Sequence, residues 1–218
     1  MSDIFQEVDE ALQKEKIEKI WHDHKDKIVT AIAALIIGTG GISFYNGWDQ
    51  KADGKDTAQL ISALDSELSI ESLNAVSEDT RSGVATISNF LTSGLQLEQD
   101  KKQDAINTYD TIINKTAPNA GLEDLARILK SQYSDDSEAD LKTLKPVIAD
   151  KKSPFHWHAR LQAATIEAEK NENYNAALEY LTPVLEAENV SATLKQRANA
   201  LHHIYKIKNS QAKNNEKS

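Results

Sequence analysis

The side chains best suited to chemistry in this sequence are its six histidines, which form three close pairs: His22 and His24, His156 and His158, and His202 and His203. Two imidazoles share a metal when they lie on one face, which on a helix requires a spacing of three or four residues. These pairs are one or two residues apart, on segments that we expect to be helical. The spacing therefore predicts no metal site at any pair, and we expect no cofactor.

The run SPFHWHARL is the most chemically suggestive, because Trp157 separates its two histidines. Ser153 and Pro154 are typical of the N-cap and the first residue of a helix. The two histidines would then point to different faces of the first turns. We therefore favour a structural interpretation, in which Trp157 or Phe155 packs against the preceding repeat.

Other catalytic arrangements are missing from the sequence. The chain has no cysteine, which excludes a thiol nucleophile, disulfides and cysteine-bound metal sites. It has no glycine-rich phosphate loop, no H-E-x-x-H motif and no serine, histidine and aspartate set. Glu167 and Glu169 are two residues apart on a predicted helix and so do not face each other. We expect a protein that is not an enzyme.

Composition indicates which elements carry these residues. The chain has only 8 glycines and 4 prolines, and the residues that dominate it lose little freedom in a helix. Aromatic residues make up 6%, which argues against a β-sandwich. The formal net charge of −9 argues against a nucleic-acid-binding protein. The composition predicts an all-α fold.

Residues 28–45, IVTAIAALIIGTGGISFY, form an uncharged run of 18 residues. About 20 apolar residues are needed to cross a bilayer, and extending the run to Trp48 reaches that length. Tyr45 and Trp48 would lie at the headgroups of one leaflet, and Lys27 would close the other end. We predict a single transmembrane anchor over residues 28–48.

Two alternatives fit this run less well. A cleaved export signal has an apolar run of about 7–15 residues and a small-residue cleavage site, which is missing here. A buried core helix would show a recurring polar face. Five lysines precede the run and two follow it: Lys14, Lys16, Lys19, Lys25 and Lys27 against Lys51 and Lys55. This bias predicts a cytoplasmic N-terminus, with residues 49–218 outside.

Two further features flank or line the predicted anchor. Thr30, Ala34, Gly38 and Gly41 lie close to one helical face, where small residues let another helix approach. The alternative is that glycine is simply common in membrane helices.

The pattern of residues 1–27 predicts an amphipathic cytoplasmic helix that precedes the anchor. This helix lies on the membrane, docks on a partner or simply leads into the anchor. It contains eight acidic residues and five lysines, which disfavours strong membrane binding.

The outer segment contains an internal repeat. Four apolar groups with the spacing i, i+3, i+6, i+7 begin at Ile70, Ile106, Leu141 and Leu178, which are 36, 35 and 37 residues apart, although Ser77 breaks the fourth place of the first group. This period is close to that of the tetratricopeptide (TPR) repeat, a helix–turn–helix unit. Ala105 and Ala177 precede the second residue of their groups by four positions, as a small residue does in a TPR. Asp140 occupies this place in the third group, which is therefore degenerate, and the first group is the weakest.

Each apolar group follows a predicted partner helix: residues 54–67, 80–98, 120–133 and 154–170. A final helix over 192–207, capped by Ser191, is predicted to close the solenoid, with these residues inward: Leu194, Ala198, Leu201, Ile204 and Tyr205. The sequence thus predicts a TPR-like α-solenoid of helix pairs over 49–207, followed by a disordered tail over 208–218.

The concave surface of such a solenoid usually binds an extended peptide or a helix. With the small residues as register marks, the predicted groove residues are Phe90, Leu97, Gln162, Ile166 and Glu169. Residues 49–218 contain 20 basic and 26 acidic residues. This balance mildly favours a basic or amphipathic ligand.

Four stretches of the sequence resemble one family: MSDIFQEVDEALQKEKIEKIW, the span ending GGISFYNGW, SPFHWHARLQAATIEAE and RANALHHIY. The chain is similar, over nearly its whole length, to the YfgM-like ancillary subunits of the SecYEG translocon, in particular their α-proteobacterial form. The resemblance implies a bacterial inner-membrane protein with a periplasmic TPR-like domain. It also implies association with SecYEG and with a membrane-anchored periplasmic chaperone of the prolyl-isomerase type.

The resemblance carries no catalytic residue over to this chain. It favours a non-enzymatic adaptor or chaperone-associated factor that assists newly exported proteins at the translocon. The alternative is a scaffold for another envelope assembly, such as the cell-wall or division machinery. A soluble enzyme with a hydrophobic core helix is a third, less favoured hypothesis.

Overall fold

The computed structural model describes residues 50–65 and 69–215, which are helical or lie in short connections between helices. The chain divides into two units, Met1–Gly54 and Lys55–Ser218. The second unit holds almost all of the described residues.

The predicted cytoplasmic helix over 1–27 and the predicted anchor over 28–48 lie outside the described residues. Within the described part of the chain, no helix is both long enough and apolar enough to cross a membrane. The anchor therefore stays a prediction from the sequence.

The predicted all-α class is confirmed for the described residues. Their elements are α2 (Gln50–Asp65), α3 (Ile70–Asp79), α4 (Ser82–Glu98), α5 (Lys102–Thr111), a π-helical segment η1 (Ile112–Thr116), α6 (Ala120–Tyr133), α7 (Ser137–Ala149), α8 (His156–Glu169), α9 (Tyr174–Glu186) and α10 (Ala192–Asn215). The predicted partner helices correspond to α2, α4, α6 and α8. The four apolar groups lie on α3, on α5 with η1, on α7 and on α9.

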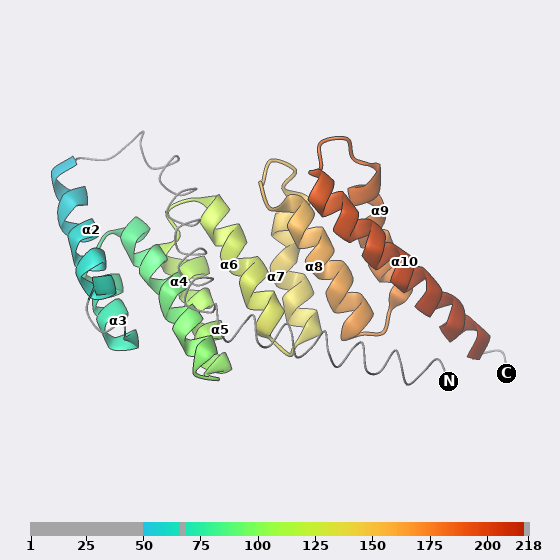
Figure 1. Ribbon diagram of the computed structural model, residues 1–218, viewed down its shortest axis with the longest axis horizontal. Helices are drawn as coiled ribbons and strands as arrows, with labels where there is room; N and C mark the ends of the chain where they lie inside the picture. Colours follow the sequence, from blue (N-terminus) through green and yellow to red (C-terminus); the bar gives the residue numbers. More distant parts are fainter. Residues whose placement is uncertain (1–49, 66–68, 216–218) are drawn as a thin grey trace. The chain divides into compact units, whose positions relative to one another are not determined.

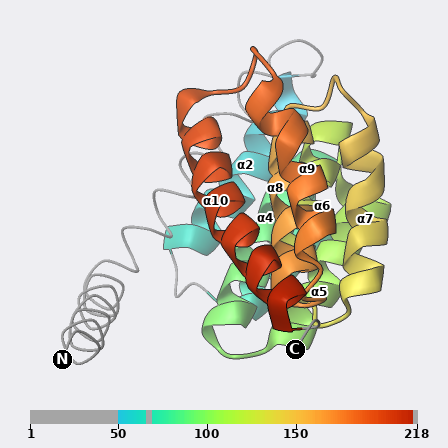
Figure 2. The same cartoon turned by 90° about the vertical axis from the view of Figure 1, so that its right-hand side faces the viewer.

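The helices follow one another in space in the same order as in the sequence (Figure 1). From α3 onward each helix packs against the next, and α8 also contacts α6 and α10. Figure 2 shows α10 lying across α8 and α9. The unit is therefore a run of helix pairs in which each pair packs mainly against its neighbours.

The apolar groups supply the centre of each pair. Their second and third members are at most 6% exposed: Leu73 and Val76, Tyr109 and Ile112, Leu144 and Val147, and Leu181 and Val184. The outer members are half-buried along the contact edges. Full burial of such a side chain stabilises the fold by about 1.5–3 kcal/mol. The repeated spacing in the sequence is thus the repeated core of the pairs.

Short polar side chains begin several of these helices. The side chains of Asn119, Asp136 and Asn173 accept hydrogen bonds from the backbone N–H of Leu122, Ala139 and Ala176, respectively. Each bond satisfies one of the N–H groups that have no partner in the first turn. These caps fix where α6, α7 and α9 begin, and so set the turns between helices.

The end of the chain differs from the prediction. Helix α10 continues to Asn215, so residues 208–215 are helical and the predicted disorder over 208–218 is wrong for them. The Asn209 amide donates to the Asn175 side chain of α9 at 2.7 Å, and the Lys208 ammonium lies 5.7 Å from the centre of the Tyr174 ring. These contacts hold the helix beyond its predicted end.

Two details of the helix faces and ends also differ. The sequence pattern predicts that Ile204 faces inward on the last helix, but it is 46% exposed, while its neighbour Tyr205 is 3% exposed. The inward face therefore includes Tyr205 and excludes Ile204. Helix α8 begins at His156 with Phe155 at the N-cap, rather than with Ser153 and Pro154. The Ser153 hydroxyl accepts from the Phe155 N–H, so it stabilises the turn that leads into the helix.

Candidate functional site

The turn between α6 and α7 is the centre of the most developed polar site among the described residues. Helix α6 ends at Tyr133, and the Ser134 hydroxyl accepts a hydrogen bond from the Asp136 N–H at 3.1 Å. The Asp136 carboxylate then caps α7 by accepting from Ala139 N–H at 3.0 Å. This chain of side-chain bonds gives the turn a fixed shape and leaves Asp135 at its tip.

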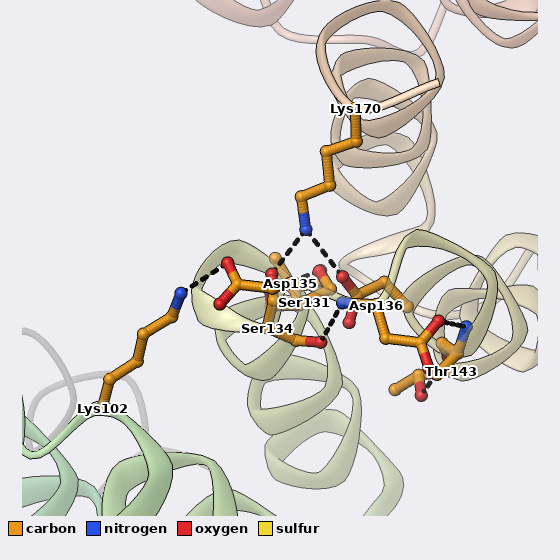
Figure 3. Close-up of polar contacts among 10 residues, drawn as sticks. Lys102, Ser131, Ser134, Asp135, Asp136, Thr143 and Lys170 are labelled. Atoms are coloured by element: carbon orange, nitrogen blue, oxygen red, sulfur yellow. Dashed lines mark hydrogen bonds and ion pairs between the residues drawn. The ribbon is translucent and has the colours of Figure 1, made fainter.

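Two lysines from the neighbouring helix pairs hold this turn (Figure 3). The Lys102 ammonium, at the start of α5, donates to the Asp135 carboxylate at 2.6 Å. The Lys170 ammonium, at the end of α8, donates to the Ser134 carbonyl oxygen at 2.6 Å and to the Asp140 carboxylate at 2.8 Å. The two lysines come from the pair before and the pair after, so the turn links three consecutive pairs.

Asp140 is the most unusual member of this cluster, because its carboxylate is buried. The residue is 1% exposed, and it stands four positions before Leu144, where Ala105 and Ala177 stand in the second and fourth groups. Removing a carboxylate from water costs several kcal/mol unless a cation compensates it. Lys170 provides this cation. Asp140 also lies in the first turn of α7 and Lys170 at the end of α8, where the helix dipoles favour their charges.

A hollow of about 550 Å³ opens beside the turn. Its walls come from α5, the end of α6, the turn itself and α7, and its lining includes Gln103, Asn107, Asp110, Lys130 and Thr143. On one wall the Lys130 ammonium lies 2.6 Å from the Asp110 carboxylate. The amides of Gln103 and Asn107 are exposed and bond to each other at 3.2 Å. The hollow thus presents amides, hydroxyls and paired charges to solvent.

The site presents an ionised carboxylate and two exposed amides. The hydrogen bond from Lys102, together with its charge, lowers the pKa of Asp135, which is therefore ionised at neutral pH. Exposed primary amides can pair with the backbone of an extended segment, because each offers both a donor and an acceptor. The arrangement suits recognition of a peptide-like ligand.

A second polar contact joins α6 to the turn before α8. The Ser153 hydroxyl donates to the Asp124 carboxylate at 2.6 Å. Burial raises the pKa of Asp124, because the surrounding helices remove water from its carboxylate. This contact fixes the approach of the HWH run to the α6–α7 pair.

The HWH run is structural in its surroundings. His156 is 3% exposed, its ring centre lies 4.5 Å from that of Trp157, and its Nε2 accepts from the Arg160 guanidinium at 3.3 Å. Burial, aided by the Arg160 charge, lowers the pKa of His156 and keeps its imidazole neutral. His158 is exposed, so the prediction that the two histidines occupy different faces is confirmed.

The aromatic neighbours of these histidines pack in opposite directions. Phe155 joins the cluster formed by α6, α7 and α8, which confirms the predicted contact with the preceding repeat. Trp157 instead packs on the cluster formed by α8, α9 and α10. Within the described part of the chain, no three histidine or acidic side chains gather closely enough to hold a metal ion.

The predicted groove residues do not form one surface. Phe90 and Ile166 are 7% and 1% exposed and belong to two core clusters, so their assignment to a groove is wrong. Leu97 and Gln162 are half-buried, and Glu169 is exposed. Ile166 shares a helical face with Gln162 and Glu169, and Phe90 shares one with Leu97, so a small rotation of each helix decides which of them is buried.

The predicted membrane-facing residues are not placed. The packing face of Thr30, Ala34, Gly38 and Gly41 lies outside the described residues. The interface anchors Lys27, Tyr45 and Trp48 lie there too. Both sets stay predictions from the sequence.

The sequence pattern does not predict the lysine-held turn, by which we mean residues 134–136 and their contacts with Lys102 and Lys170. One signal for it is nevertheless present. Asp140 broke the small-residue pattern of the third group. A charge in a buried repeat position needs a partner, and in a solenoid an adjacent pair can supply it. Lys170 lies 30 residues further along and Lys102 lies 33 residues before Asp135, both close to one repeat.

Comparisons of the chain with models of protein families, with curated proteins and with solved structures give no match. The assignment of the site therefore depends on its own geometry, on the helix-pair arrangement and on the sequence pattern. Of these, the geometry of the α6–α7 turn is the most specific.

Proposed function

We propose that this chain is a non-enzymatic, membrane-anchored adaptor whose outer domain is a TPR-like solenoid. The observation that carries the proposal is the run of helix pairs with a buried apolar group recurring every 35–37 residues. Buried alanines at equivalent places, Ala105 and Ala177, are what a TPR-like pair requires for close helix contact. Solenoids of this kind act by binding other proteins.

The proposed setting is the Sec translocon. The resemblance to YfgM-like subunits supports a single-pass protein of the bacterial inner membrane, with its C-terminal domain in the periplasm. Its proposed partners are SecYEG and a membrane-anchored periplasmic chaperone of the prolyl-isomerase type. In this role the domain assists newly exported proteins through protein–protein contacts. The hollow beside the α6–α7 turn is the proposed contact surface, because its exposed amides suit an extended segment.

Site-specific crosslinking in native membranes tests this proposal. A photo-reactive residue at Asn107 is expected to crosslink to a SecYEG subunit or to the chaperone, each identified by mass. The same residue at Gln132, an exposed amide of α6 outside the hollow, is the matched control. Recovery of cell-wall or division proteins instead would favour the alternative envelope scaffold. Release of the protein from membranes by carbonate would contradict the anchor.

The binding role of the hollow has its own test. Replacing both amides, Gln103→Ala and Asn107→Ala, is expected to reduce crosslinking from a reporter at Thr111 several-fold without unfolding α5. Gln132→Ala should leave the yield unchanged. Equal yields from both variants would contradict the hollow as the contact surface while leaving the adaptor role open to the first experiment.

A further inference from the structure

The last helix has a charge unlike that of any other α-helix in the described part of the chain. Residues 192–215 contain five lysines and arginines and no acidic residue, whereas every other described α-helix carries at least one carboxylate. Residues 50–191 contain 14 basic and 24 acidic residues, a net charge of −10. The domain is therefore polarised, because α10 carries a net charge of +5 while residues 50–191 carry −10.

The cations of α10 are not consumed within the described part of the chain. None of the described ion pairs involves Lys195, Arg197 or Lys206. Lys208 lies over the Tyr174 ring without a carboxylate partner. These side chains remain available to pair with acidic groups of another molecule.

The same helix exposes the largest apolar side chains at its end of the domain. Ile204 and Ile207 are each 46% exposed and lie three residues apart, so they share a face. On a helical wheel, Arg197 and Lys208 lie next to Ile204, whereas Lys206 lies about 100° beyond Ile207 on the other side. An apolar centre with a charged rim is the usual composition of a protein–protein interface.

The neighbouring helix carries the complementary charge. The exposed face of α9 holds Asn175, Glu179, Thr182 and Glu186 at helical spacing. None of the described ion pairs includes either glutamate. Helices α9 and α10 pack side by side, so one end of the domain presents an acidic stripe next to a basic, apolar one. Such a surface is complementary to a rotated copy of itself.

A second copy fits this surface better than an anionic membrane does. A membrane-bound helix needs a broad apolar face, but the exposed half of α10 also carries polar residues such as Asn199 and Ser210. The carboxylates of α9 would also be repelled by anionic lipid headgroups. In a two-fold dimer, by contrast, each glutamate stripe meets the other copy's lysines.

We propose that α10 is a self-association surface, through which two copies of this chain form a two-fold dimer. Ile204 and Ile207 of both copies pack together at its centre. At the rim, Arg197 and Lys206 of one copy pair with Glu179 and Glu186 of the other. This inference does not depend on the proposed role at the translocon.

Sedimentation equilibrium of the full-length chain in mild detergent tests the dimer. The wild-type chain is expected to sediment as a dimer at low salt and to dissociate more readily at high salt, because ion pairs form its rim. Ile204→Glu combined with Ile207→Glu is expected to weaken the dimer on the order of 100-fold, since both residues lie at its centre. Ile61→Glu, at an exposed isoleucine of α2, is the matched control and should leave the dimer intact.

Charge reversal provides a test that misfolding cannot imitate. Glu179→Lys with Glu186→Lys should weaken the dimer, and so should Arg197→Glu with Lys206→Glu. A chain carrying all four substitutions should recover dimerisation, because each pair is then restored with opposite sign. Failure to recover would overturn the proposed pairing.

The absence of cysteine from the chain permits a direct geometric test. A single Ile207→Cys substitution is expected to give a disulfide-linked dimer under mild oxidation, whereas Ser62→Cys on α2 should not. A wild-type chain that is monomeric at all concentrations would overturn the proposal, and so would a dimer that survives the Ile204 and Ile207 substitutions. Binding of a monomeric chain to anionic vesicles through α10 would overturn it in favour of a lipid surface.

Discussion

In α9 the residue four positions before the buried Leu181 is Ala177, whereas in α7 the residue four positions before the buried Leu144 is Asp140. Both residues are at most 1% exposed, and both lie against the preceding helix of the run. Ala177 belongs to an apolar cluster shared by α8, α9 and α10. Asp140 instead pairs with Lys170, which comes from the following helix pair.

The difference shows that a helix-pair repeat tolerates a buried charge where the next pair supplies a counter-charge. The repeat position four residues before the buried leucine thus has an apolar version, with Ala177, and an ionic version, with Asp140 and Lys170. The apolar version depends only on shape, because an alanine requires no partner. The ionic version depends on two residues that are 30 positions apart, so removing either one leaves an uncompensated group. We expect the ionic version to restrict how the two pairs pack, since Asp140 and Lys170 must meet.

Placing a charge at Ala177, the apolar version of the repeat position, should reduce the stability of the fold more than any other substitution considered. Ala177→Asp puts a carboxylate into the cluster around Leu181 and is expected to lower the free energy of unfolding by more than about 4 kcal/mol. Urea denaturation followed by circular dichroism measures this loss. Ala58→Asp, at an exposed alanine of α2, is the control and should change stability little. Wild-type stability in the Ala177 variant would show that the fourth pair also accommodates a charge.

Removing the counter-charge from the ionic version should have the next largest effect. Lys170→Met leaves Asp140 buried without a partner and is expected to lower the free energy of unfolding by about 3 kcal/mol. Adding Asp140→Ala to the same chain converts the third pair to the apolar version. The double variant should return to within about 1 kcal/mol of the wild type.

The control for this series is Lys145→Met, at an exposed lysine of α7 that takes part in none of the described ion pairs. It should leave the unfolding midpoint nearly unchanged. If the double variant is as unstable as Lys170→Met alone, then Lys170 acts through its bond to the Ser134 carbonyl oxygen rather than through Asp140.

The contact between the pairs α6–α7 and α8–α9 should lose stability in acid, because His156 is buried there. Burial lowers the pKa of this imidazole, so the folded chain binds a proton less readily than the unfolded chain. The stability it contributes is therefore complete above about pH 6.5 and is lost as the pH falls through the lowered pKa, with a slope of at most about 1.4 kcal/mol per pH unit. Urea denaturation between pH 7.5 and pH 5 should show this loss.

His156→Gln is expected to flatten this dependence, because glutamine does not titrate. His203→Gln, at an exposed histidine of α10, is the matched control and should leave the wild-type profile unchanged. An equal acid loss in the wild type and the His156 variant would assign the effect to another group.

The smallest effect on stability is expected at Lys102, the more exposed of the two lysines that contact the α6–α7 turn. Lys102 and Asp135 form a solvent-exposed pair, and such pairs contribute less than about 1 kcal/mol. Lys102→Met should therefore barely change stability, but it should raise the pKa of Asp135 back toward its usual value, because that lysine is the main cause of the lowering. Carboxyl NMR titration measures this shift, and an unchanged pKa would contradict the contact.

Much of the fold follows from one spacing in the sequence. The groups starting at Ile106, Leu141 and Leu178 predict the buried positions of their helices, because burial of apolar side chains determines which face turns inward. The small residues at Ala105 and Ala177 are buried as a TPR-like pair requires. Even the weak first group, at Leu73 and Val76, is buried.

The remaining features depend on contacts between residues far apart in the sequence. The pattern marks Asp140 as an exception but does not reveal whether Lys170 reaches it. The placement of Phe90 and Ile166 requires the exact rotation of α4 and α8 about their axes, which the sequence pattern does not determine. The length of α10 depends on its contacts with Tyr174 and Asn175, which composition alone does not encode.

The lysine-held turn also bears on how the domain unfolds. In a run of units that contact only their neighbours, stability is a sum of local terms, and the ends fray first. Lys170 adds a bond from α8 to both α7 and the turn before it, so the pairs α6–α7 and α8–α9 should open as one cooperative block. Backbone amides of α7 and α8 would then exchange their hydrogens at a common rate, more slowly than those of α2 and of the free end of α10.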